Sequence, residues 1–269
     1  MPNTQRNSAA GGSGHQHKAL LMAEIEDTER PYPRPLSGAK VRHLPSALVP
    51  ARTALIGRYV MLEPLDAGRH ASDLFEASHG NEAALQIWDY LPWGPWKSEV
   101  EYRNVLRQQT ARHEQIYYAV RPATGAKACG QTSFLDIQPE HGVIEIGSIW
   151  FGLTRRRTRG ATEALYLMLR YAMDDLGYRR MQWRCNALNA ASRAAARRLG
   201  FRFEGVFHNH MIFKGRNRDT AWYSILDDEW PEAREIMEQW LAPSNFDQDG
   251  TAKTSLAALM ANRGRSRRA

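Results

Sequence analysis

The sequence predicts a protein of the α+β (mixed α/β) class, with a largely antiparallel central sheet flanked by helices. Stretches that alternate polar and apolar residues, as strands do, are interleaved with stretches of helical spacing. Three of the strand-like stretches follow one another with only short turns between them, which favours antiparallel neighbours. Hydrophobic residues make up 43% of the chain, with eight tryptophans and ten tyrosines, which is enough to build a core.

The composition divides the chain of 269 residues into three parts. Residues 1–50 are rich in proline, glycine and small polar residues, and we expect a flexible extension there. Residues 51–242 carry the alternating strand and helix patterns and form the predicted domain, of an ordinary size for one domain. Residues 243–269 are expected to be a loose, basic C-terminal tail.

The first half of the domain begins with a short strand and contains three consecutive strands. The segment RYVMLEPL (58–65) alternates and ends at Pro64, and a helix follows from helical spacing. An aromatic loop, WDYLPWGPW, holds two prolines and precedes a second helix that begins at a Ser-x-x-Glu pattern. Turns at ATGAK and PEHG separate the next strands. The expected helices are 67–79 and 98–113, the loop is 88–96, and the three strands are 116–121, 129–137 and 143–153.

The second half alternates between helices and strands. A helix at 161–177 has its apolar residues on one face and ends at Gly177, a residue that suits a helix C-cap. A strand at 179–187 precedes a short helix that Asn189 can cap and Gly200 can end. The remaining expected elements are a hairpin of strands 201–215 and 218–226, and a final helix at 227–241.

The net charge of +7 comes from the two ends of the chain. Residues 251–269 hold five basic side chains and no acidic one, and residues 1–50 hold six basic against four acidic ones. The domain is therefore neutral, which makes a nucleic acid an unlikely partner. No apolar run approaches the roughly 20 residues that span a bilayer, so we expect a soluble protein without a membrane partner.

The chain has only two cysteines, Cys129 and Cys185, and both fall in predicted strands. This excludes a disulfide framework and makes a cysteine-based metal site implausible, because no CxxC pair exists. A reducing compartment, the cytoplasm, is the simple expectation. Acylation of Cys185 is conceivable, but a strand cysteine is more often an inert part of the core.

Four arginines crowd the start of the predicted helix in TRRRTRGATEAL, residues 154–165. A helix N-terminus already carries partial positive charge and free N–H groups, so added arginines favour an anion there. Because the domain is otherwise neutral, a small anionic ligand fits this local charge better than a nucleic-acid backbone. The alternative is an arginine-rich turn that is only solvated.

Five segments together resemble one known family. GRYVMLEPL, IEIGSIWFG, RTRGATEAL, NALNAASRAAARRLGFRFEG and RDTAWYSILDDEW occur in the order found in the GNAT superfamily of N-acetyltransferases, in particular the branch of ribosomal-protein alanine/serine N-acetyltransferases. The resemblance covers residues 55–242. It implies the GNAT-type acyl-CoA N-acyltransferase fold, with acetyl-CoA as co-substrate and no metal.

The resemblance also implies an activity. Members of the family transfer an acetyl group directly from acetyl-CoA to a primary amine in a ternary complex, and we expect the acceptor here to be a small-molecule or peptide amine. A monomer or a homodimer is expected. The alternative is a non-catalytic acyl-CoA-binding or interaction module on the same fold.

The same resemblance assigns the cofactor site residue by residue. The family's Q/R-x-x-G-x-G/A turn, which binds the pyrophosphate, matches in one register only, and the sequence departs from it at Thr162. The family's strand before this turn contacts the pantetheine arm, and its Asn-x-x-Ser pattern falls on Asn189 and Ser192. Core packing and helix capping explain the strand and Asn189 equally well. The implied cofactor-binding residues are Ile149, Trp150, Phe151, Leu153, Arg156, Arg157, Thr158, Arg159, Gly160, Ala161, Thr162, Asn189 and Ser192.

Catalytic candidates come from both arguments. Glu145 is a carboxylate in an apolar strand, so burial would raise its pKa toward that of a useful base, although an ion pair with an arginine is an equal alternative. The family's usual tyrosine proton donor falls on Ala196, which leaves Ser192 or water for the departing thiolate. Trp93 and Trp96 of the aromatic loop, and His210 on a later strand, are the candidate substrate contacts.

Overall fold

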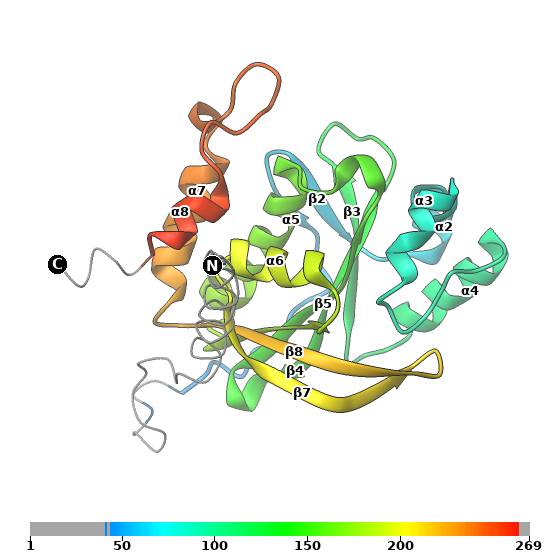
Figure 1. Cartoon of the computed structure of the whole chain (residues 1–269), viewed down its shortest axis with the longest axis horizontal. Coiled ribbons are helices and arrows are strands. Elements are labelled where there is room, and N and C mark those ends of the chain that lie inside the picture. The colour runs from blue at the N-terminus through cyan, green and yellow to red at the C-terminus, as the bar shows by residue number, and fades with distance from the viewer. Residues whose placement is uncertain (1–40, 42–43, 264–269) are drawn as a thin grey trace, which may run out of the picture. The chain divides into compact units, whose positions relative to one another are not determined.

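One eight-stranded sheet runs through the structure in the order β1-β2-β3-β4-β5-β6-β8-β7 (Figure 1). The structure, a computed structural model, describes residue 41 and residues 44–263. All neighbouring strands are antiparallel except β5 and β6, which are parallel. The strands are β1 (Leu55–Ile56), β2 (Val60–Pro64), β3 (Ile116–Pro122), β4 (Gly130–Gln138), β5 (Val143–Phe151), β6 (Arg180–Asn186), β7 (Arg202–Phe213) and β8 (Arg216–Leu226).

Helices cover both faces of the sheet (Figure 1). Alternate residues of β3 point to opposite faces, so Tyr118 belongs to one hydrophobic cluster and Tyr117 to the other. On the first face lie α5 (Arg159–Arg170), α6 (Ala190–Arg198), α7 (Trp230–Leu241) and α8 (Leu256–Ala261), and on the second α2 (Ala67–His79), α3 (Glu82–Leu85) and α4 (Glu99–Thr110). The predicted class, a mostly antiparallel sheet flanked by helices, is confirmed.

Helix α5 is the crossover between the parallel strands β5 and β6, and its start is firmly anchored. The hydroxyl of Thr158 caps it by accepting the Ala161 N–H. The buried carboxylate of Glu163 accepts the backbone N–H groups of Arg58, Tyr59 and Val60, at 2.6–3.0 Å. These three bonds fix the first turn of α5 against the beginning of β2.

The C-terminal segment is where the structure departs most from the sequence-based prediction of a loose tail. Residues 256–261 form α8, whose Leu256 and Met260 are buried in the same cluster as α5 to α7. Arg263 donates to the Gly200 carbonyl at 2.7 Å. The prediction was wrong for this segment because one helical turn with two apolar residues is too short for a periodicity signal. Residues 264–269 lie outside the described part of the chain.

The N-terminal boundary differs as well. The hydroxyl of Ser46 donates to the Leu176 carbonyl, and the Leu48 carbonyl accepts the Tyr178 hydroxyl at 2.9 Å. Residues 44–50, which were predicted to belong to the extension, therefore pack on the domain. The rest of the predicted extension, residues 1–40, 42 and 43, lies outside the described residues.

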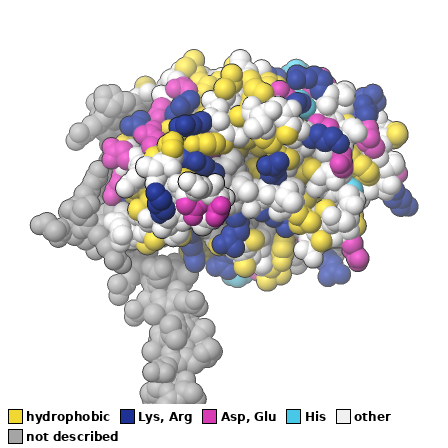
Figure 2. All heavy atoms as spheres, turned by 90° about the horizontal axis from the view of Figure 1, so that it is seen from above, with side chains coloured by type: hydrophobic (Ala, Val, Ile, Leu, Met, Phe, Trp, Pro, Cys, Tyr) yellow, Lys and Arg dark blue, Asp and Glu magenta, His cyan; other side chains and the backbone are white. Residues whose placement is uncertain are grey.

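The surface carries its charges in a mixed pattern. On the face seen in Figure 2, lysine and arginine side chains are scattered among acidic and apolar ones rather than gathered into one continuous patch. Within the described residues, no helix combines the length and the apolar character that crossing a membrane requires.

The buried position of α8 yields a stability prediction. Leu256→Ala should lower the free energy of unfolding by about 2–5 kcal/mol, because it removes a buried leucine side chain and leaves a cavity. Leu188→Ala, at a leucine that is 77% exposed, is the matched control and should change it by less than about 0.5 kcal/mol. Chemical denaturation of both variants measures the difference; equal stabilities would mean that α8 does not pack as described.

Candidate active site

The parallel strands β5 and β6 are hydrogen-bonded along only part of their length. Their pairing covers Val143, Ile144 and Glu145, opposite Arg180, Met181 and Gln182. Beyond this point β5 stays paired with β4, and β6 stays paired with β8. The two strands therefore separate, and backbone N–H and C=O groups of β5 are left without a partner on the side of β6.

A bulge lies in β5 directly after the separation. Between the pairs Gln131↔Trp150 and Ser133↔Gly147, β5 has one residue more than β4. Ser148, in this bulge, has a φ of +52°, a conformation that few residues other than glycine adopt. Such a bulge turns the strand and redirects its backbone groups, here toward the gap between β5 and β6.

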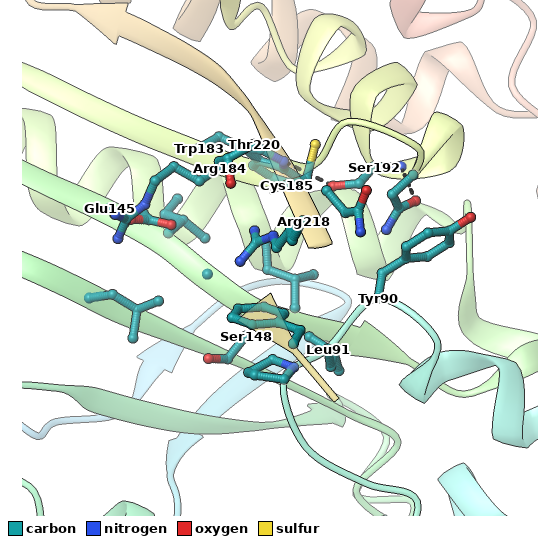
Figure 3. Close-up of a pocket in the computed structure, with 18 of the residues that line it drawn as sticks. Tyr90, Leu91, Glu145, Ser148, Trp183, Arg184, Cys185, Ser192, Arg218 and Thr220 are labelled. Carbon is teal, nitrogen blue, oxygen red and sulfur yellow. Dashed lines mark hydrogen bonds and ion pairs between the residues drawn. The ribbon is translucent and has the colours of Figure 1, made fainter. Parts of the chain in front are cut away.

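The gap opens into a cavity of about 350 Å³ (Figure 3), within the range of small-molecule sites. Strands β5 and β6 form one side of it, the β7–β8 hairpin a second, and the aromatic loop a third. Two hydrogen bonds link these parts: Lys214 Nζ donates to the Trp88 carbonyl at 2.6 Å, and the Tyr90 hydroxyl donates to the Leu188 carbonyl at 3.4 Å. Lining residues used below are Trp93, Arg112, Glu145, Ile149, Trp183, Arg184, Cys185, Asn189, Ser192, Phe213 and Arg218.

Glu145 lies in the wall of the cavity and is 3% exposed. Burial raises the pKa of its carboxyl group, and the charge of Arg184, with which it forms an ion pair, lowers it. The net direction is upward. Both interpretations of this residue from the sequence thus meet in one side chain, a buried carboxylate with a raised pKa and an arginine partner. Arg184 itself was not singled out from the sequence.

Ser192 and Asn189 lie at the start of α6, at the end of the cavity opposite Glu145 in the view of Figure 3. The Asn189 side chain accepts the Ser192 N–H at 3.0 Å and so caps the helix, as expected. The Ser192 hydroxyl accepts the Trp183 Nε1–H at 3.0 Å, which leaves its own proton available for donation. Burial raises the pKa of the neighbouring Cys185 thiol, which makes it a poor nucleophile.

The predicted substrate contacts separate in the structure. Trp93 lines the cavity. Trp96 instead packs against Trp88 and Tyr102, with ring centroids 4.8 and 4.9 Å apart, and anchors the aromatic loop. His210 lies outside the cavity lining and has its Nδ1 3.0 Å from the Thr220 hydroxyl.

The predicted pantetheine strand also divides. Ile149 lines the cavity, whereas Trp150 is buried against Trp88 at a centroid distance of 5.6 Å. Phe151 lines a second hollow, of about 310 Å³, beside the start of α5, and Leu153 is 37% exposed. Side chains of this strand thus serve mainly the core, and its backbone serves the gap.

The arginines before α5 have different neighbours. Arg156 Nε donates to the Phe151 carbonyl at 3.2 Å. The guanidinium of Arg159 lies between the rings of Tyr59 and Phe246, at 3.9 and 3.8 Å from their centroids, and it also donates to the Leu241 carbonyl. Arg157 has a φ of +61°, and no described carboxylate pairs with it.

Helix α6 brings a further arginine to the start of α5. Arg198 Nη1 donates to the Thr162 hydroxyl at 3.0 Å, and Thr162 in turn donates to the Thr158 carbonyl. Burial and the nearby charge of Arg157 lower the pKa of Arg198. Sequence reasoning missed Arg198 because it is 36 residues away from Thr162 along the chain. Arg157 and Arg198 form a pair of cations at a helix N-terminus, which is suited to a phosphate group.

Metal chemistry finds no cluster here: within residues 44–263, no group of three or more histidine, cysteine, aspartate or glutamate side chains could hold an ion.

Known proteins share these features. The GNAT acetyltransferase domain model matches residues 60–202, more than half of the chain. A GCN5-related N-acetyltransferase from Brucella melitensis is 42% identical, with a TM-score of 0.77 over 82% of this chain and 99% of that one. A probable GNAT-family acetyltransferase from Chromobacterium violaceum is 40% identical, with a TM-score of 0.65 over 75% and 98%.

A curated relative from Bacillus subtilis, named "Putative ribosomal N-acetyltransferase YdaF", is 25% identical over 63% of this chain and 91% of its own length. The expected resemblance to the ribosomal-protein branch is confirmed by this match. The separated parallel strands, the bulge between them and the arginine-rich helix start therefore belong to an enzyme of the acyltransferase class, and the chain is a member of the GNAT acetyltransferase family.

Proposed function

We propose that the protein transfers an acetyl group from acetyl-CoA to the primary amine of a small molecule or peptide, directly and within a ternary complex. The observation that carries this proposal is the course of β5. Its unpaired backbone groups face a cavity, and the strand leads to the N-terminus of α5 with Arg157 and Arg198 beside it. One continuous surface thus offers backbone hydrogen bonds for an extended pantetheine arm and cations for a pyrophosphate.

The residues of the start of α5 fit such a cofactor. The N–H groups of Arg159 and Gly160 have no acceptor within the helix, since they belong to its first turn. Of the arginines, Arg157 and Arg198 supply charge to the phosphates, whereas the side chain of Arg159 holds the loop against Tyr59 and Phe246. Asn189 and Ser192 lie farther along the path, at the end of the cavity.

The chemistry needs one proton removed and one supplied. The amine nitrogen loses a proton and attacks the thioester carbonyl; a C–N bond forms, the C–S bond breaks and the departing thiolate takes up a proton. Free N–H groups of β5 near the bulge would stabilise the oxyanion of the intermediate. Glu145 is our candidate base and Ser192 our candidate acid, because the alternative position, Ala196, has no proton to give and is fully buried.

The cation pair at α5 gives the first test of this proposal. Arg157→Ala and Arg198→Met should each weaken acetyl-CoA binding by about tenfold or more, since a charge-assisted hydrogen bond contributes about 1.5–3 kcal/mol. Isothermal titration calorimetry measures the affinity. Arg197→Ala, an exposed arginine on the same helix, is the matched control and should bind as the unaltered protein does. Unchanged affinity in both test variants would contradict the assigned phosphate site.

The raised pKa of Glu145 gives the second test. A base acts when deprotonated, so the rate of acetyl transfer should rise with pH as the pH passes the raised pKa of this carboxyl group. Glu145→Gln should lower kcat by about 10²–10⁴ and remove that limb of the pH–rate profile. Free-thiol release from acetyl-CoA, followed across pH in the presence of an amine, measures it. A profile that the substitution leaves intact would assign the base to another group.

A further inference from the structure

The cavity contains a guanidinium group that the proposed transfer does not use. Arg218, on β8, lines the cavity and lies between Glu145 and Ser192 in the view of Figure 3. Its Nε is buried and has no hydrogen-bond partner among the described residues. Its contacts within the described chain are weak ones for a cation: the sulfur of Met211, 3.4 Å from Nη1, and the ring of Phe213, 4.4 Å from Cζ.

No carboxylate of residues 44–263 forms an ion pair with Arg218. The nearest acid of the cavity, Glu145, is engaged by Arg184. A charged group that is removed from water without an anionic partner is costly, and in most proteins it is paired or hydrogen-bonded. A guanidinium also offers parallel N–H groups that match a carboxylate or a phosphate in two-point contact.

The charge of the whole cavity points the same way. Its described lining holds three arginines, Arg112, Arg184 and Arg218, but one carboxylate, Glu145. Such a site repels a polyamine or another acceptor that carries only positive charge. It favours an acceptor whose amine lies close to a negative group, and the surrounding cations also favour the neutral, nucleophilic form of that amine.

From these observations we infer that Arg218 binds an oxyanion of the acceptor, so that the substrates of this enzyme are amines that also carry a carboxylate or a phosphate. The inference rests on the proposed function, since it names the acceptor class of the same cavity. The apolar side chains of Trp93 and Phe213 beside Arg218 favour an acceptor with an apolar body next to the oxyanion.

Probes that resemble an acetylated product test this without knowledge of the natural acceptor. N-acetyl-L-phenylalanine, its uncharged primary amide, and phenyl phosphate are titrated into the full-length protein loaded with CoA. The arginine Nε–Hε signals in 1H–15N NMR spectra report binding, and the signal lost in Arg218→Met identifies Arg218. We expect the Arg218 signal to shift saturably with at least one oxyanion, about tenfold more tightly than with the amide.

Comparison of the carboxylate with the phosphate then shows which oxyanion the site prefers. Arg218→Met should abolish the preference over the amide, and Arg218→Lys should restore part of it, since the charge returns without the fork. Arg216→Met removes an exposed arginine from the same strand and should bind the probes as the unaltered protein does. Equal binding of the amide, no binding of any probe, or an oxyanion preference that survives Arg218→Met would each overturn the inference.

Acetyl-CoA affinity, measured on the same samples, separates this inference from the proposed function. If acetyl-CoA binds and the oxyanion preference is absent, the acceptor class is wrong while the proposed function stands. If acetyl-CoA does not bind, the proposed function itself fails, whatever Arg218 does with the anions.

Discussion

The site depends on one constraint, the early end of the parallel pairing between β5 and β6. Each strand keeps its antiparallel partner on the outer side, so the sheet holds together while its middle opens. The backbone of β5 then faces a cavity with unused hydrogen-bonding groups, which in a closed sheet would be satisfied by β6. Every other part of the site is placed by this opening: α5 begins beyond the end of β5, α6 follows the end of β6, and the β7–β8 hairpin closes one side.

Much of this organisation could be predicted from local patterns. Alternation marked the strands, and apolar spacing together with Gly160 and the arginines marked the start of α5. Glu145 was recognisable as a carboxylate in an apolar strand. These features depend on residues close together along the chain, where periodicity and capping rules apply.

Contacts between distant segments could not be predicted in this way. Arg184 reaches Glu145 and Arg198 reaches Thr162 only because strands and helices from different parts of the chain meet. The same limit explains why Trp96 was expected in the substrate pocket, although its ring packs against Trp88 and Tyr102. An arginine-rich motif likewise cannot show which guanidinium faces a ligand and which is held by aromatic rings.

Arg159 illustrates what that distinction means for the evolution of the enzyme. Its ring partner Phe246 comes from the segment behind α7, so the beginning of α5 is held partly by residues more than 80 positions later in the chain. Relatives that lack this C-terminal segment must hold the arginine of their own loop by other means or leave it free for the phosphates. Family members can therefore share the same loop sequence and still divide the work among its arginines differently.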